Sequence, residues 1–216
     1  MDVGILGGTG PAGRGLATRL AAAGIGVVIG SRDESRAAGV AKELGARWPG
    51  RPLAIAGAAN AAAAGAEVVV VATPWDSAVA TAGAHASALE GKVVVSMANA
   101  LVKEGREMLA LVPPRGSIAA AVQAALPGSL VAAAFHHLPA ADMADLDARL
   151  RADVLVCSDH RQATERTMEL VRAIEGLRPL DAGSLSQAAA IEAFTAVCVT
   201  VNIRHRARST LRLEGI

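Results

Sequence analysis

Short apolar runs alternate with amphipathic stretches along most of this chain. The runs are rich in β-branched residues and too short for typical helices, so they predict buried strands of a parallel sheet. They cover residues 3–6, 26–30, 52–56, 67–72, 92–96 and 130–135. The stretches between them predict helices over 14–23, 33–44, 58–65, 76–89 and 117–126. This strand–helix repeat predicts an α/β fold with a Rossmann-type, doubly wound parallel sheet and right-handed crossovers.

The pattern changes after residue 135. The later strands are expected at 153–157, 177–181 and, as an edge strand, 210–214, with a helix at 162–175. We therefore expect a Rossmann domain over 1–140 and a small C-terminal α/β domain over 141–216. Within the first domain, the charged segment 102–116 contains Pro113-Pro114 and predicts a loop with a short helix.

The stretch 186–205 is apolar on nearly all sides, because Glu192 is its only charge between Gln187 and Arg204. A helix with no polar face must be buried, and in so short a chain we expect the burial in a homodimer interface. Its β-branched residues leave a strand as the alternative.

Glycines follow the first predicted strand directly. Gly8, Gly10 and Gly13 have the G-x-G-x-x-G spacing between a strand and a helix, which is typical of a dinucleotide site. The spacing allows a tight turn, a close backbone approach to a pyrophosphate, and close packing of helix on strand. The alternative interpretation is a tight turn without a ligand.

The end of the second strand indicates which dinucleotide binds. NAD-binding proteins usually carry an acid about 20 residues past the glycines, but here Ser31 and Arg32 come first and Arg36 follows one helical turn later. A hydroxyl with two guanidinium groups suits the 2′-phosphate of NADP. Asp33 is then the N-cap of the next helix. The alternative is that both arginines belong to a solvated helix face with neighbouring acids.

Two more strand ends should face the same crevice. Thr73-Pro74-Trp75 follows the strand 67–72, and Met97-Ala98-Asn99 follows the strand 92–96. Asp76 is the expected cap of the helix that runs to Leu89. Trp75 is equally well explained as an ordinary cover over the core.

Composition excludes several classes of function. The 216-residue chain has a net charge of +1, which argues against a nucleic-acid surface. Cys157 and Cys198 lie in apolar runs and look like reduced core residues, and no His or Cys spacing suits a metal. No leader segment is evident, and the longest uncharged stretch, residues 116–141, is too interrupted to span a membrane. We expect a soluble, cytoplasmic protein.

Several stretches together resemble one family, the NADPH-dependent reductases of the deazaflavin coenzyme F420. The stretches are 6–10, 30–32, 73–75, 134–141, 154–157 and 174–183. The resemblance implies a Rossmann domain with a small C-terminal domain, assembled as dimers. It also implies NADP and F420 as coenzymes, with a hydride moving between the nicotinamide C4 and the deazaflavin C5.

The resemblance also assigns residues. The donor coenzyme is expected on Gly8, Thr9, Gly10, Pro11, Ala12, Gly13, Ser31, Arg32, Arg36, Thr73, Pro74, Trp75, Met97, Ala98 and Asn99. The acceptor is expected on His136, His137, Leu138 and Pro139. His136 is the candidate to donate a hydrogen bond to a ring carbonyl. The alternative is that one of the two histidines, His136 or His137, only satisfies a backbone carbonyl at the strand end.

Two departures from the family pattern leave alternatives open. Arg36 stands where relatives often have lysine, a conservative change toward a phosphate. The stretch Arg204-His205-Arg206-Ala207-Arg208 replaces a glycine-rich tail, so the way the deazaflavin side chain is held is not evident. An NADP reductase with a changed acceptor and a non-catalytic NADP sensor are the alternative functions.

Overall fold

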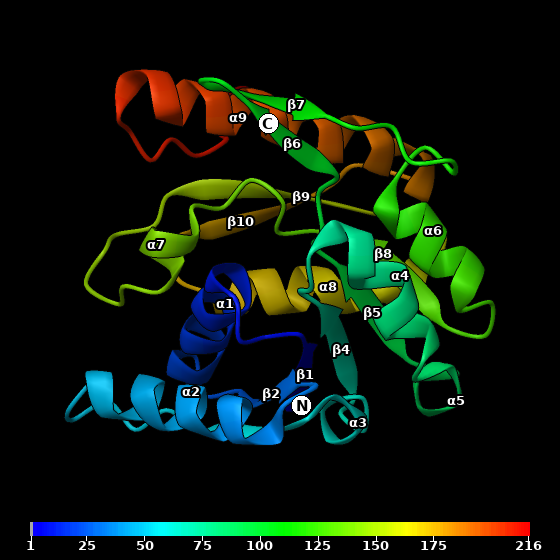
Figure 1. The fold of residues 1–216 in the computed structure, drawn as a ribbon. Coiled ribbons are helices and arrows are strands. Elements are labelled where there is room, and N and C mark those ends of the chain that lie inside the picture. The colour runs from blue at the N-terminus through cyan, green and yellow to red at the C-terminus, as the bar shows by residue number, and fades with distance from the viewer. Residues whose placement is uncertain (1) are drawn as a thin grey trace.

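Eight strands form a mixed sheet at the centre of the computed structural model, which describes residues 2–216 (Figure 1). Their order across the sheet is β10-β9-β8-β5-β4-β1-β2-β3. The bounds are β1 (Asp2–Leu6), β2 (Gly26–Ser31), β3 (Ile55–Ala59), β4 (Val68–Val71), β5 (Val93–Ser96), β8 (Leu130–Ala133), β9 (Ala152–Ser158) and β10 (Leu177–Asp181). A separate hairpin consists of β6 (Leu101–Glu104) and β7 (Glu107–Ala110).

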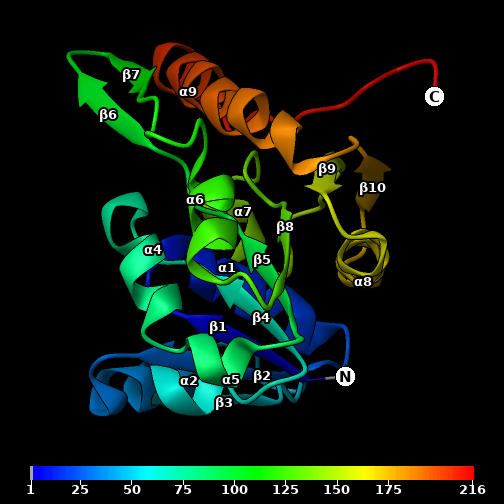
Figure 2. The same ribbon diagram turned by 90° about the vertical axis from the view of Figure 1, so that its right-hand side faces the viewer.

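Helices cover both faces of the sheet (Figure 2). They are α1 (Pro11–Ala22), α2 (Glu34–Arg47), α3 (Asn60–Ala63), α4 (Trp75–Gly83), α5 (Ala86–Leu89), α6 (Ile118–Ala125), α7 (Ala140–Met143), α8 (Arg161–Ala173) and α9 (Ala188–His205), with a 3₁₀ turn at Leu185–Gln187. Residues of α1, α2 and α8 share one hydrophobic cluster, and residues of α3, α4 and α6 share another on the opposite face. All four valines of β4 are buried because they lie between these two layers.

The six strands from β3 to β8 are parallel, as the strand–helix repeat predicted. Beyond β8, where the sequence pattern also changes, the sheet is no longer parallel throughout. β9 runs antiparallel to β8 and pairs with it only at Ala132–Ser158 and Ala133–Cys157. The chain leaves β8 through a loop and the single turn of α7, so it returns in the opposite direction instead of crossing over. β10 then lies parallel to β9.

The segment predicted as a loop with a short helix is the β6–β7 hairpin. Gly105 makes its turn with φ +57°. The Met108 N–H donates to Thr200 Oγ1 at 2.8 Å, and Figures 1 and 2 both show the hairpin beside α9. These strands form because α9 covers them, and that partner lies ninety residues away in the sequence.

Several predicted boundaries were also wrong. The third strand lies at Ile55–Ala59 rather than 52–56, and the helix after it is only Asn60–Ala63. The helix expected to reach Leu89 breaks into α4 and α5, and its N-cap is Pro74 instead of Asp76. The caps Asp33 and Ser117 are confirmed, since their side chains accept from Arg36 N and Ala120 N.

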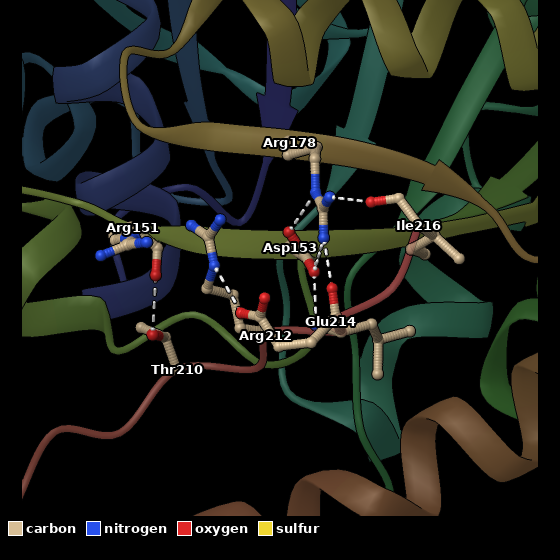
Figure 3. A network of polar contacts seen from close by, with 8 residues as sticks. Arg151, Asp153, Arg178, Thr210, Arg212, Glu214 and Ile216 are labelled. Atoms are coloured by element: carbon tan, nitrogen blue, oxygen red, sulfur yellow. Dashed lines mark hydrogen bonds and ion pairs between the residues drawn. The ribbon is translucent and has the colours of Figure 1, made fainter.

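The tail expected as an edge strand lies against β9 without forming a ladder. The Asp153 N–H donates to Leu211 O at 2.8 Å. The buried Asp153 carboxylate accepts from Leu213 N and from Nε and Nη2 of Arg178, whose contact Figure 3 shows. Arg178 also reaches Ile216 O at 2.8 Å. One backbone hydrogen bond and several side-chain bonds therefore hold the tail where the prediction assumed a backbone ladder.

The helix α9 is confirmed, so its strand alternative is excluded. One side of it is buried on the core through Ile191, Glu192 and Thr195, while Phe194 and Val197 are 43% and 52% exposed. The 185–205 stretch is the one helical segment within residues 2–216 whose length and apolarity suit a membrane span, which is weak support for one.

Candidate active site

Two clefts lie at the carboxyl ends of the parallel strands, on either side of the N-terminus of α1. The first has a volume of about 250 Å³. It is lined by Gly7, Thr9, Gly10, Ser31, Arg32, Arg36, Asn60, Ala72, Thr73, Pro74, Ser77 and Thr81. The structure therefore brings together the glycine turn, the arginine pair and the turn after β4, as the sequence predicted.

The glycines each have a structural reason. Gly7 adopts φ +64°, and a Cβ on Gly13 would lie 2.6 Å from Gly8 Cα, so only glycines allow α1 to pack on the turn. Gly10 is the N-cap of α1 and offers no side chain to its first-turn N–H groups. A Cβ on Gly10 would meet nothing within 4 Å, so space is open where a phosphate can approach these amides.

The arginine pair lies at the far end of this cleft. Arg32 and Arg36 are exposed, and neither forms an ion pair within residues 2–216. The solvated-face alternative involves two acids, Asp33 and Glu34. Asp33 is occupied as a helix cap by Ser35 Oγ and the Arg36 N–H, and Glu34 forms no ion pair within residues 2–216. These hydrogen bonds, that of Ser35 first, lower the pKa of Asp33. Both guanidinium groups thus remain available to an anion.

Sequence reasoning missed Asn60. This buried residue at the start of α3 lines the cleft, and its Oδ1 accepts from Gly7 N at 3.1 Å. It holds the glycine turn from a segment fifty-three residues away. No local pattern singles out an asparagine in an alanine-rich helix, although asparagine is favoured at helix starts. Ser77 and Thr81 on α4 were missed for the same reason.

The second cleft has a volume of about 310 Å³ and is mostly apolar. Its lining comes from α1, the end of β5, the segment 135–143 and α9, and consists of Ala12, Leu16, Met97, Asn99, Leu101, Phe135, His136, Leu138, Pro139, Ala140, Met143, Thr195 and Val199. It therefore includes three of the four residues expected to hold the acceptor. Thr195 and Val199 were not predicted, because they reach the cleft only through the packing of α9.

His136 belongs to a buried hydrogen-bond network in this wall. Its Nδ1 lies 3.0 Å from Asn99 Oδ1, which also accepts from Thr195 Oγ1 at 3.0 Å. Because an amide oxygen carries no hydrogen, Nδ1 is the protonated nitrogen and Nε2 bears a lone pair. Burial, and then the neighbouring His137, lower the pKa of His136 to about 3. Nε2 is buried and has no partner within the described residues.

Some of the predicted site residues line neither cleft. His137 Nε2 lies 2.8 Å from Ile191 O, and its ring packs edge-on against Phe194 rather than on the second cleft. Trp75 is the first residue of α4 and is 37% exposed. Ala98 is buried in the core, whereas Pro11 faces an open depression beside α7.

Comparisons with known proteins agree with this geometry. Residues 2–100 match the family model described as NADP oxidoreductase coenzyme F420-dependent. The F420-dependent NADP reductase of Methanothermobacter marburgensis is 36% identical over 214 residues, which cover 97% of this chain and 96% of that one. This chain belongs to the F420-dependent NADP reductase family. The family resemblance expected from the sequence is confirmed.

Further relatives support the same membership and fold. The F420-dependent NADP reductase of Methanocaldococcus jannaschii is 34% identical over 215 residues, covering 97% of this chain and 96% of that one. A solved structure from Arthrobacter sp. fb24, provisionally assigned as an F420-dependent NADP reductase, has a TM-score of 0.78 at 26% identity and 96% coverage of both chains. Glycerol-3-phosphate dehydrogenase from Coxiella burnetii shares the fold, with a TM-score of 0.61 at 18% identity over 83% of this chain and 54% of that one.

Proposed function

We propose that this member of the F420-dependent NADP reductase family transfers a hydride between NADPH and coenzyme F420. The observation that carries the proposal is the pair of clefts that meet at the N-terminus of α1. The first is polar and ends at two unpaired guanidinium groups, while the second is apolar with one buried imidazole. A phosphorylated dinucleotide fits the first, and a flat ring system fits the second.

The chemistry of hydride transfer comes from the two coenzymes, which supply a donor carbon and an acceptor carbon. The protein needs no nucleophile. Its residues hold two rings face to face and exclude water. In this proposal Thr9, Gly10 and the first turn of α1 take the pyrophosphate, and Ser31, Arg32 and Arg36 take the 2′-phosphate. The segments 73–75 and 97–99 flank the ribose and nicotinamide.

For the acceptor, we assign His136 the opposite polarity to the one expected from the sequence. Since Nδ1 donates to Asn99, Nε2 accepts a hydrogen bond, and its natural partner is a ring N–H of the deazaflavin. Leu138 and Pro139 supply the apolar contact beside it, and Met143 and Val199 close the cleft. The unpartnered Nε2 supports this assignment, because a buried acceptor without a donor costs free energy.

The division of labour between the two parts of the chain belongs to the same proposal. Residues 1–140 bind NADP, and residues 141–216 complete the acceptor cleft and supply a homodimer interface. The support is that Met143, Thr195 and Val199 line the second cleft and that α9 keeps an apolar stripe exposed. We further propose a cytoplasmic location. The support is that α9, which belongs to the one candidate membrane span within residues 2–216, makes polar contacts with α6 and the hairpin that tie it to the rest of the fold.

A direct assay tests the proposed function. Purified protein mixed with NADPH and oxidised F420 should bleach the visible absorbance band of the deazaflavin, and NADH should do so far less well. Tight NADPH binding without bleaching would favour a non-catalytic NADP sensor. Oxidation of NADPH by another acceptor, but not by F420, would favour a reductase with a changed acceptor.

A further inference from the structure

Arg19 makes an unusual set of contacts from the middle of α1. Its side chain is buried, and its guanidinium donates only to main-chain carbonyls. Nη2 reaches Asp142 O at 2.7 Å and Ala148 O at 2.8 Å, and Nε reaches Met143 O at 3.2 Å. Nη2 also donates to Asp145 O. One side chain therefore gathers four carbonyls from the segment 142–148.

The segment 142–148 needs such a partner. It begins inside α7, which has only four residues, so a helical ladder serves few of its carbonyls. Asp142 O and Asp145 O each accept one backbone N–H, at 3.3 and 3.1 Å, and each has a second lone pair to offer. A guanidinium presents five N–H donors in a fixed plane, whereas a lysine ammonium is a point charge with three. The positive charge also suits the negative end of a helix. Arg19 thus adds hydrogen bonds to the few that the backbone of this segment makes itself.

A glycine permits the same docking. A Cβ on Gly15 would lie 2.7 Å from Met143 Cβ and 3.0 Å from Ala140 O, so α7 lies directly against the backbone of α1. Arg19 and Gly15 are one helical turn apart on α1, and both face α7. The two residues therefore fix α7 on α1 independently, one by donating hydrogen bonds and the other by leaving space.

The consequence concerns the two clefts. Gly10 at the start of α1 borders the first cleft, whereas Ala12 and Leu16 on the same helix border the second. Ala140 and Met143 of α7 line the second cleft as well, and Arg19 holds Met143 by its carbonyl oxygen. The same helix, α1, therefore borders the proposed donor site and holds α7, which forms one wall of the proposed acceptor site.

We propose that Arg19 is a positioning residue that sets the acceptor wall at a fixed distance from the NADP-binding turn. It touches neither coenzyme and acts through α7 alone. The proposal rests on the proposed function, because it assigns the second cleft to the deazaflavin. Loosening α7 leaves the glycine turn intact and misplaces the acceptor ring, and a misplacement of about 1 Å is enough to slow a reaction on the order of a hundredfold.

The test compares Arg19→Gln, Arg19→Lys and Gly15→Ala with the wild type. We expect Arg19→Gln and Gly15→Ala to raise the KM for F420 and to slow single-turnover hydride transfer, each on the order of tenfold or more, with the Kd of NADPH unchanged. Arg19→Lys should recover part of the loss. Gly15→Ala displaces α7 while keeping Arg19. The test therefore does not depend on whether the Arg19→Gln variant folds well.

Arg178→Gln is the matched control, because it removes an arginine of β10 that also gathers carbonyl and carboxylate oxygens but lines neither cleft. It should lower the free energy of unfolding without changing the KM for F420. Hydrogen exchange supplies a readout independent of turnover, since amides of residues 142–150 should exchange faster in Arg19→Gln.

Two results would overturn the proposal. One is an unchanged KM and single-turnover rate in folded Arg19→Gln and Gly15→Ala. The other is a parallel loss of NADPH affinity, which would make Arg19 a general stability residue. If the wild-type protein fails to reduce F420, the proposed function fails. The hydrogen exchange of residues 142–150 in Arg19→Gln would then test only whether Arg19 holds this segment on α1.

Discussion

At the scale of single residues, the proposed coenzyme sites depend on charge and on hydrogen-bond polarity. The first prediction concerns Arg32→Asp, which places a negative charge where we propose that the 2′-phosphate binds. Hydrogen bonds to charged groups contribute about 1.5–3 kcal/mol, so the affinity for NADPH should fall roughly tenfold to a hundredfold. The affinity for NADH should change little. Titration of both coenzymes measures this. Arg161→Asp, at the exposed start of α8, is the control, and equal losses for NADPH and NADH would contradict the phosphate assignment.

The second prediction concerns His136→Leu, which removes the acceptor Nε2. We expect the KM for F420 to rise on the order of tenfold or more, because a donor N–H of the ring loses its partner. His136→Gln keeps a carbonyl oxygen as acceptor and should lose less. Since burial keeps the pKa of His136 near 3, its protonation should not shape the activity between pH 6 and 9. A wild-type pH profile with an inflection near 6.5 that disappears in His136→Leu would contradict this.

The scale of secondary-structure elements is illustrated by the junction of α9 with α6. The buried Glu192 carboxylate accepts from Ile118 N at 2.8 Å and from Ala119 N at 3.0 Å, beside the cap Ser117. One helix thus caps another. The same side of α9 carries Thr195, which bonds to Asn99 in the His136 network. The junction fixes the helix that completes the second cleft.

The third prediction concerns the pH dependence of stability at this junction. Burial raises the pKa of Glu192 from 4.5 to about 7, although the two amides oppose the shift. Between these values the folded protein holds a proton that the unfolded chain has lost, so stability falls as the pH rises from 4.5 to 7. Glu192→Gln should remove this loss, which is on the order of 3 kcal/mol. Urea denaturation at pH 5 and pH 8 measures it, and the same pH dependence in both proteins would contradict the assignment.

The sequence predicted most elements well where the signal was local. The valines of β4, the turn at Gly7 and Gly8, and the caps Asp33 and Ser117 are each set by neighbours within a few residues. The β6–β7 hairpin failed because its strands depend on the distant α9 for cover. Asn60 and Thr195 were missed for the same reason, since each acts through a contact more than fifty residues away.

At the scale of the whole molecule, one apolar stripe of α9 is exposed in the single chain. Phe194, Val197 and Val201 follow one another at helical spacing on one side of α9, and all are more than a third exposed. The core and the hairpin cover its other sides. A stripe of this kind supports the proposed homodimer, in which the same surface meets itself across a two-fold axis.

The fourth prediction tests this assembly. Val197→Arg places a charge in the centre of the stripe, so sedimentation should change from a dimer mass to a monomer mass. Ala46→Arg, on the exposed face of α2, is the matched control and should leave the mass unchanged. A wild-type protein that sediments as a monomer at micromolar concentration would contradict the dimer.

The sequence by itself determined the parallel half of the sheet, the glycine turn, the arginine pair and the family. These features depend on periodicity and turn chemistry, which contiguous residues encode. Only the tertiary structure decided the antiparallel return of β9, the course of the tail, the polarity of His136 and the clamp of Arg19 on α7. Each of these follows from contacts between segments far apart in the chain, and the hydrogen-bond partners that such contacts supply leave no pattern in the local sequence.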